Sequence, residues 1–398
     1  MELKYGLISA DSHAGFDRDD FTSRMSAAKW GDKIPHVAAA PPRERDADAA
    51  PSPFGGHEGG DGWTVYGQPP GALANCPALM PKNPVVSPKR WEEVPRGYYD
   101  PAERLKRLDE DGVDAEVLFP NPPGNTFFSF KDADFELDAV RAYNDALGDW
   151  TKVSDRYWPL MTLPWLQEMP GMVAELERAV AAGHKGINMP GHTPSGLPPI
   201  FNPHWDPIWD ACQQLDIPVH FHGSAGIHAG MKLKQWDGYS RRQGHSAFTS
   251  TSAVTPAQIV PNMIFAGVTD RFPQLKVVFA EAGIGGLNYV ISACDYEWEK
   301  RRLWEEGLIT RPSETVRRQM FVNFWFEDEG IKLRHDIGID NIMWESDFPH
   351  ITAYYPDSWK AVDRVLEGVS ESDRTKLLYE NALRVYGVNA TIKTPVPA

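Results

Sequence analysis

Short apolar runs alternate with longer stretches of helical periodicity along most of the chain. The apolar runs cover four to six residues each, a length and composition typical of buried strands. Strands are predicted at residues 7–10, 115–119, 157–162, 186–189, 218–222, 276–280, 320–324 and 342–345. Helices are predicted at residues 101–111, 135–153, 172–182, 205–215, 257–268, 287–304, 328–337 and 372–386. This α/β alternation predicts a (β/α)8 TIM barrel, with a doubly wound open sheet as the alternative.

Residues 35–99 interrupt this alternation. They are rich in proline and glycine but also contain Trp63, Tyr66 and Trp91. In a barrel they would leave the carboxyl end of the first strand, where barrels carry their active sites. We therefore expect one barrel domain over residues 1–390 in which 35–99 forms a partly ordered lid or an oligomer contact, with a plain flexible linker as the alternative. Residues 391–398 are expected to be a frayed tail.

Charge and cysteine content limit the kinds of partner and the cellular location that we expect. The net charge is −15, from 40 basic and 55 acidic residues. Such a surface repels phosphate backbones and anionic lipid, so we expect no nucleic-acid or membrane partner. No apolar run approaches the ~20 residues of a membrane span, and the first residues lack a signal-peptide pattern. Three cysteines without a CxxC pair argue against disulfides and cysteine–zinc sites, which favours the cytoplasm.

Polar residues of the kind that bind metals follow several predicted strands. They are Asp11 and His13 after the first strand, His220 and His222 at the end of the fifth, Glu281 after the sixth and Asp347 after the eighth. The carboxyl ends of barrel strands form one rim, so these side chains are expected to meet. Taken singly, each could have a structural role. Together, carboxylates and imidazoles from four strands predict a divalent-metal site.

The remaining histidines are less informative. His350 comes three residues after Asp347 and could orient that carboxylate. His245 lies in a loop on the same face of the barrel and could contact substrate. We predict that His220, His245 and His350 support the metal ligands or contact substrate. The chain has no GxGxxG fingerprint and no GxSxG elbow, which disfavours nucleotide binding and serine hydrolase chemistry.

Four segments resemble a known family. They are Ile-Ser-Ala-Asp-Ser-His at 8–13, Pro-Val-His-Phe-His at 218–222, the run at 267–283 and Trp-Glu-Ser-Asp-Phe-Pro-His at 344–350. They resemble the amidohydrolase-related family, in the branch of aminocarboxymuconate-semialdehyde decarboxylase and the aromatic-acid decarboxylases. The resemblance implies a (β/α)8 barrel with a divalent metal bound by Asp11, His13, His222 and Asp347. Relatives often carry a catalytic histidine where this chain has Glu281.

We therefore expect a metal-dependent enzyme that hydrolyses a C–N or C–C bond of a small carboxylated substrate, or decarboxylates it. Glu281 and Asp347 are the expected acid/base groups, and Glu281 is also a candidate ligand. Zinc is the first expectation, with iron or manganese and one or two ions as alternatives. A dinuclear iron or manganese oxygenase and a non-catalytic metal-bound subunit are the other hypotheses. We expect a homo- or hetero-oligomer.

Overall fold

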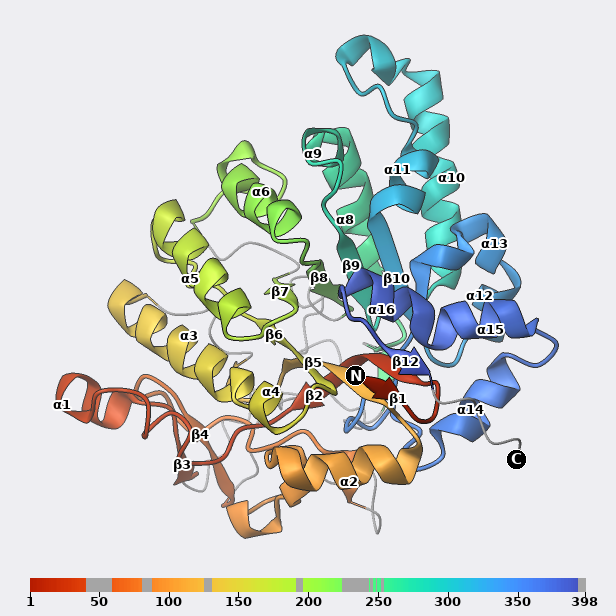
Figure 1. Ribbon diagram of the computed structural model, residues 1–398. Coiled ribbons are helices and arrows are strands. Elements are labelled where there is room, and N and C mark those ends of the chain that lie inside the picture. The colour runs from red at the N-terminus through yellow and green to blue at the C-terminus, as the bar shows by residue number, and fades with distance from the viewer. Residues whose placement is uncertain are drawn as a thin grey trace.

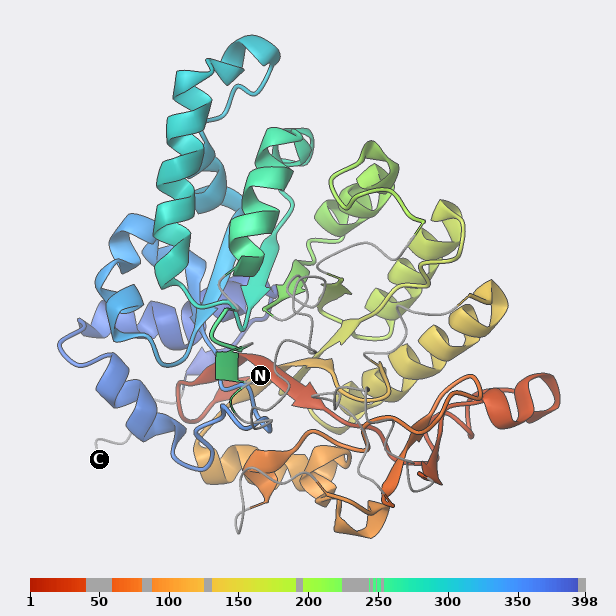
Figure 2. The ribbon, with the colours of Figure 1, turned by 180° about the vertical axis from the view of Figure 1, so that it is seen from behind.

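The chain folds around one parallel sheet of eight strands. A computed structural model describes residues 1–40, 59–80, 88–124, 131–190, 196–223, 243, 246–247, 249–251 and 254–392. The strands follow one another in chain order, and they are β2 (Ile8–Ala14), β5 (Ala115–Pro120), β6 (Tyr157–Met161), β7 (Gly186–Met189), β8 (Val219–His222), β9 (Val277–Ala280), β10 (Met320–Phe324) and β11 (Ile342–Trp344). Helices surround the sheet (Figures 1 and 2). The predicted TIM barrel is confirmed.

The barrel closes between its first and last strands. Neighbouring strands elsewhere share parallel ladders, but β2 and β11 stand at the two ends of the sheet. They are joined through residues 345–348, where Ser12 and Phe348 form an isolated bridge. The backbone N–H of His13 donates to the carbonyl oxygen of Phe348 at 2.7 Å, and that of Asp347 donates to the carbonyl oxygen of Asp11 at 3.0 Å. We call this contact between β2 and residues 345–348 the seam.

The first helix of the barrel has the bounds that its sequence predicts. In α2 (Pro101–Asp111), the Asp100 side chain accepts hydrogen bonds from the backbone N–H groups of Ala102 and Glu103. Proline at the first helical position removes a donor that would have had no partner. Gly112 ends the helix at a φ of 70°, a left-handed conformation that glycine adopts without strain.

The other helices are α1 (Ala27–Trp30), α3 (Ala133–Gly148), α4 (Trp150–Val153), α5 (Met169–Ala181), α6 (Asp206–Gln214), α8 (Val254–Phe265), α9 (Val268–Arg271), α10 (Gly285–Lys300), α11 (Pro312–Gln319), α12 (Asp328–Lys332), α13 (Arg334–Ile337), α14 (Ser358–Val365), α15 (Glu371–Thr375) and α16 (Asn381–Val385). The sequence prediction missed α11 and α14. Each has only 8 residues, so two turns give little periodic signal. The predicted helix at 372–386 is interrupted by a π-helical turn at Lys376–Glu380.

The interior of the barrel is a packed apolar core. Alternate residues of the strands point inward, among them Val117, Phe119, Val278 and Met343. Tyr386, at the end of α16, packs beneath them from the amino-terminal side. Outward-facing residues join the helices in a second, larger cluster. The polar groups at the carboxyl rim therefore stand on a floor of apolar side chains.

The described part of the 35–99 insertion packs against the barrel. Its strands β3 (His36–Ala39) and β4 (Asp61–Thr64) form an antiparallel pair. Trp63 is buried, and its indole N–H donates to the carbonyl oxygen of Leu73. The backbone N–H of Ala78 donates to the carbonyl oxygen of Pro349 at 3.0 Å, directly beside the seam. A function of this segment as a lid stays a prediction.

The chain ends show one departure from expectation. Strand β12 (Thr391–Ile392) pairs in parallel with β1 (Glu2–Leu3), so the prediction of a frayed tail is wrong for these two residues. Residues 393–398 of the predicted tail lie outside the described residues. In the described part of the chain, we find no helix with the length and apolarity that a membrane span requires.

Candidate metal centre

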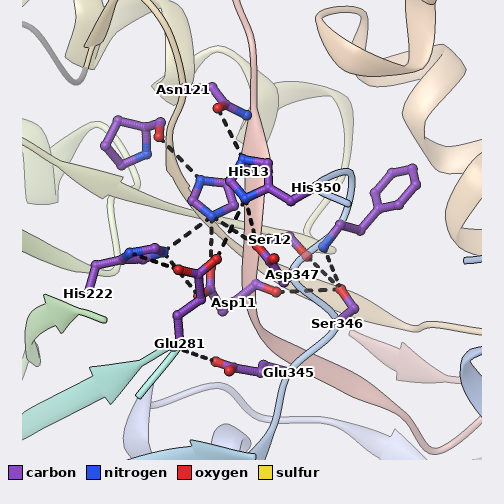
Figure 3. A network of polar contacts seen from close by, with 12 residues as sticks. Asp11, Ser12, His13, Asn121, His222, Glu281, Glu345, Ser346, Asp347 and His350 are labelled. Carbon is purple, nitrogen blue, oxygen red and sulfur yellow. Dashed lines mark hydrogen bonds and ion pairs between the residues drawn. The ribbon is translucent and has the colours of Figure 1, made fainter. Parts of the chain in front are cut away.

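Four side chains predicted as ligands converge on one point at the carboxyl rim (Figure 3). His13 Nε2 lies 3.5 Å from Asp11 Oδ1 and 3.3 Å from Asp347 Oδ1. His222 Nε2 lies 3.3 Å from His13 Nε2 and 3.4 Å from Asp11 Oδ2. Ligands bound tetrahedrally at ~2.0–2.2 Å would stand about 3.3–3.6 Å apart. Asp11, His13 and His222 are therefore spaced as ligands of a single ion, and Asp347 adjoins them through His13.

Asp11 shows that this cluster fits a cation. Its side chain is completely buried, and within the described structure neither carboxylate oxygen has a hydrogen-bond partner. Burial raises the pKa of Asp11 well above its usual range, and the charges of Asp347 and Glu281 add to this shift. A buried carboxylate without donors is costly unless a cation balances it. A divalent ion at this point would supply that balance.

A β-bulge turns Asp11 and His13 toward the site. The register of β2 against β5 shifts between Ser9 and Ser12. Both serine hydroxyl groups consequently face the seam, where they lie 2.9 and 3.1 Å from the hydroxyl of Ser346. Because successive side chains alternate, Asp11 and His13 face the opposite way, into the mouth of the barrel.

His13 is held in the form that a metal requires. Its Nδ1 lies 3.2 Å from the carbonyl oxygen of Pro120, so this nitrogen carries the proton and donates. Burial, followed by repulsion from His350, lowers the pKa of His13 to about 3. The ring is therefore neutral, and the lone pair of Nε2 faces Asp11 and Asp347.

The two carboxylates predicted as acid/base groups have unusual backbone conformations. Glu281 has a φ of 47° and Asp347 a φ of 54°, both in the left-handed region. Such residues carry strain of order 1–3 kcal/mol and are concentrated at functional sites. The Glu281 N–H donates to Glu345 Oε2 at 3.1 Å, and the Asp347 N–H donates to Asp11. These hydrogen bonds hold the turns that direct both carboxylates to the site.

His350 joins the cluster from the turn after Asp347. Its Nδ1 lies 2.8 Å from Asp347 Oδ1 and 3.6 Å from Glu281 Oε1, and its ring stacks on His13 at 3.9 Å. Its Nε2 lies 3.2 Å from Asn121 Oδ1. Burial lowers the pKa of His350, but Asp347 and Glu281 outweigh burial and raise the pKa to about 10. Reciprocally, His350 and His13 overcome the effect of burial on Asp347 and hold its pKa well below its usual range.

The described residues thus contain two overlapping groups that could hold a metal ion. One group is Asp11, His13 and His222, and the other is His13, Glu281, Asp347 and His350. All five residues predicted as ligands are brought together. Glu281 Oε2 also lies 3.4 Å from His222 Nδ1, so Glu281 can orient that ring instead of binding the ion itself.

His220 and His245 were predicted to support the site together with His350, but the described structure does not place either of them beside the ligands. His220 lies deeper in the barrel, where Nδ1 faces the carbonyl oxygen of Ile187 at 3.1 Å and Nε2 faces the hydroxyl of Tyr386 at 2.8 Å. Its nitrogens are both occupied there, away from the rim. His245 lies outside the described residues.

The sequence prediction did not assign a role to Glu345. This side chain is completely buried, and its Oε2 holds the backbone of Glu281. Burial, followed by the charge of Asp11, raises the pKa of Glu345 well above its usual range. Glu345 therefore holds its proton more readily than an exposed glutamic acid does. Its position directly before Ser346 and Asp347 was the only signal in the sequence.

An eight-stranded parallel barrel with histidines and carboxylates gathered at its carboxyl rim defines a metal-dependent TIM-barrel enzyme. The model of the family described as "Amidohydrolase" matches residues 36–388. The chain therefore belongs to the amidohydrolase family. Its chemistry is metal-dependent hydrolysis or decarboxylation, as the sequence predicted.

Similar proteins include decarboxylases. The chain is 24% identical over 329 residues to 2-amino-3-carboxymuconate-6-semialdehyde decarboxylase of Dictyostelium discoideum, covering 79% of this chain and 83% of the relative. A crystal structure of an amidohydrolase from Mycobacterium avium subsp. paratuberculosis has a TM-score of 0.70 at 19% identity, covering 97% and 100% of the two chains. A dihydroxybenzoic acid decarboxylase from Polaromonas, with bound manganese and the inhibitor 2-nitroresorcinol, has a TM-score of 0.57 at 22% identity, covering 78% and 93%.

Proposed function

We propose that this chain is a metal-dependent decarboxylase of a small carboxylated molecule. The observation that carries the proposal is the state of Glu281 at the mouth of the barrel. Burial raises the pKa of Glu281, and the charge of Asp347 adds to the shift, so this carboxyl retains its proton more readily than an ordinary one. Its side chain is still 21% exposed and can reach a substrate. Decarboxylation requires a proton donor for the carbon that loses CO2, and a carboxyl that retains its proton can act as this donor.

The reaction replaces a carboxylate by a proton. A divalent ion held by Asp11, His13, His222 and Asp347 would supply positive charge that binds the substrate and stabilises negative charge as it develops. The C–C bond to the carboxylate breaks, CO2 leaves, and the electron pair stays on the substrate carbon. Glu281 donates its proton to that carbon and recovers one from solvent. His222 Nδ1, 3.4 Å away, and His350 Nδ1, 3.6 Å away, hold the Glu281 carboxyl in place.

We propose manganese as the preferred ion, in place of the zinc first expected. Two carboxylates and two imidazoles form a donor set that manganese and iron accept as readily as zinc. The Polaromonas decarboxylase, which has the same fold, contains manganese. One ion fits the spacing of Asp11, His13 and His222, and Asp347 lies beside it in the overlapping group. The dinuclear oxygenase alternative finds no support among the relatives described, and a small-molecule substrate and an oligomeric assembly stay predictions.

The decisive assay measures CO2. The purified chain, loaded with Mn²⁺, is incubated with carboxyl-¹³C-labelled hydroxybenzoates and unsaturated dicarboxylic acids, and the release of labelled CO2 is followed by NMR. We expect release that stops when a chelator removes the ion. A parallel panel of amides and esters tests hydrolysis, and hydrolysis without CO2 release from any acid would contradict the proposal.

A variant separates the proton donor from the metal ligands. Glu281→Gln keeps the shape of the side chain but cannot donate the proton, so we expect turnover to fall by ~10²–10⁴-fold with metal content unchanged. Glu329→Gln is the matched control, because that glutamate is on the surface, where it pairs with Lys332. If Glu281→Gln turned over substrate at the rate of the control, Glu281 would not be the proton donor.

A further inference from the structure

The seam is the junction on which the metal centre depends most. It carries Asp11 and His13 on one side and Asp347 on the other. Ladders fix the neighbouring strands elsewhere in the barrel, but the described backbone of the seam has a single bridge, between Ser12 and Phe348. Small relative movements of its two sides would separate ligands that must stay about 3.3–3.6 Å apart. Contacts of side chains must therefore help to hold the two sides of the seam in position.

Arg104 of α2 reaches the seam from the helix layer. Its Nη2 donates to the carbonyl oxygen of Phe348 at 3.2 Å, the same oxygen that accepts the backbone N–H of His13 at 2.7 Å. The guanidinium group also lies 4.1 Å from the centroid of the Phe348 ring. Its Nη1 donates to the carbonyl oxygen of Gly97, at the end of the insertion. One buried cation thus contacts both the residue after Asp347 and the end of the insertion.

Glu116 of β5 holds this cation in a fixed orientation. Arg104 Nε donates to Oε1 at 2.9 Å and Nη2 donates to Oε2 at 2.8 Å, and both side chains are completely buried. Glu116 stands opposite Ser9 in the β2–β5 ladder, so its position is fixed by the sheet. Buried ion pairs usually add little net stability over apolar residues of similar size. A contribution to stability therefore does not explain why this chain buries the Arg104–Glu116 pair.

We propose that Arg104 is a positioning residue of the metal centre. With Glu116, it ties the carbonyl oxygen of Phe348 to β5 and so fixes the distance between His13 and Asp347. The proposal rests on the proposed metal site, but it does not depend on which reaction that site catalyses.

The test is a pair of double variants. Arg104→Met with Glu116→Leu removes both charges together, so neither is left buried and unpaired. The matched control is Glu175→Leu with Arg178→Met, which removes another ion pair with a fully buried glutamate, on α5. The affinity for Mn²⁺ is measured by EPR titration of metal-free protein, and the unfolding temperature is measured alongside. We expect the Arg104 double variant to bind Mn²⁺ about tenfold or more weakly, as supporting residues of metal sites do. The control should bind Mn²⁺ within about twofold of the wild type, even if it unfolds at a lower temperature.

Arg104→Lys provides the second measurement. Lysine keeps the positive charge beside Glu116 but cannot hold both the carboxylate and the Phe348 carbonyl as the planar guanidinium does. We expect its affinity to lie between those of the wild type and the double variant. Equal Mn²⁺ affinity in the Arg104 double variant and the control overturns the proposal. If that double variant does not fold, wild-type affinity in Arg104→Lys overturns it instead. A wild type that binds Mn²⁺ without releasing CO2 contradicts only the decarboxylation, and one that binds no divalent ion overturns both proposals.

Discussion

Asp11→Asn should change protein stability in opposite directions with and without metal. Asn has the shape of Asp but no charge. In the metal-free protein, Asp11 is completely buried and both of its oxygens lack a hydrogen-bond partner within the described structure. A buried carboxyl without a partner costs about 3–5 kcal/mol, whether it stays charged or takes up a proton because burial has raised its pKa. An unsatisfied buried amide costs about 1–3 kcal/mol. The metal-free variant should therefore be more stable than the metal-free wild type by about 2 kcal/mol.

The size of this effect in unfolding temperature follows from chain length. The entropy of unfolding is about 2.1 cal/mol/K per residue, which for this chain of 398 residues is about 0.8 kcal/mol/K. A gain of about 2 kcal/mol thus raises the unfolding temperature by about 2–3 °C. For the wild type, Mn²⁺ at ~1,000 times its Kd adds about 4.1 kcal/mol, or about 5 °C. The variant loses this protection, because Asp11 is one of the four converging ligands.

Differential scanning fluorimetry with chelator and with Mn²⁺ measures both states. We expect the variant to unfold above the wild type in chelator and below it in Mn²⁺. Asp328→Asn is a suitable control, since it makes the same change at an exposed carboxylate that pairs with Arg364. A variant that is less stable than the wild type in chelator, or that keeps the full Mn²⁺ shift, would refute the argument that only a bound cation compensates the burial of the Asp11 carboxyl.

Further predictions test the surroundings of the site. Burial lowers the pKa of His220 to about 3, below the usual ~6.5. Below pH 6.5, His220 therefore binds a proton in the unfolded chain but not in the folded chain. His220 should therefore lower the free energy of unfolding by ~1.4 kcal/mol per pH unit as the pH falls from about 6 to 4. In urea titrations, His220→Phe should lack this pH dependence while its metal content stays unchanged. Loss of metal in this variant would instead place His220 in the site. Gly15→Ala should destabilise the protein by about 1–3 kcal/mol, because the added Cβ would overlap the buried ring of Tyr98, and equal urea midpoints for variant and wild type would contradict this packing. His350→Gln should still bind Mn²⁺, but ~10–100-fold more weakly, because it removes the ring stacked on His13; isothermal titration calorimetry measures this affinity, and unchanged affinity would remove His350 from the centre.

The parts of the site that could be predicted from the sequence are those set by the strands. Unbroken apolar runs identify the buried strands, and the carboxyl ends of parallel strands must share a rim, so Asp11, His13, His222 and Asp347 could be brought together without coordinates. His220 shows the limit of this argument. Alternation correctly places it on the same side as His222, but two residues along a strand amount to about 6.6 Å of depth. His220 therefore lies below the rim, among the apolar side chains of the barrel interior, where it contacts Tyr386.

What could not be predicted is set by irregular backbone. Simple alternation would make Ala10, an interior residue, and Asp11 face opposite ways; only the bulge between Ser9 and Ser12 lets Asp11 turn inward as well. Glu281 and Asp347 reach the site through left-handed turns that residues other than glycine adopt uncommonly. Such conformations persist only where surrounding contacts enforce them, and here those contacts come from Glu345 and from the backbone of β2. A pattern of residue types can therefore identify the ligands of this centre, but their orientation is decided by long-range hydrogen bonds across the seam.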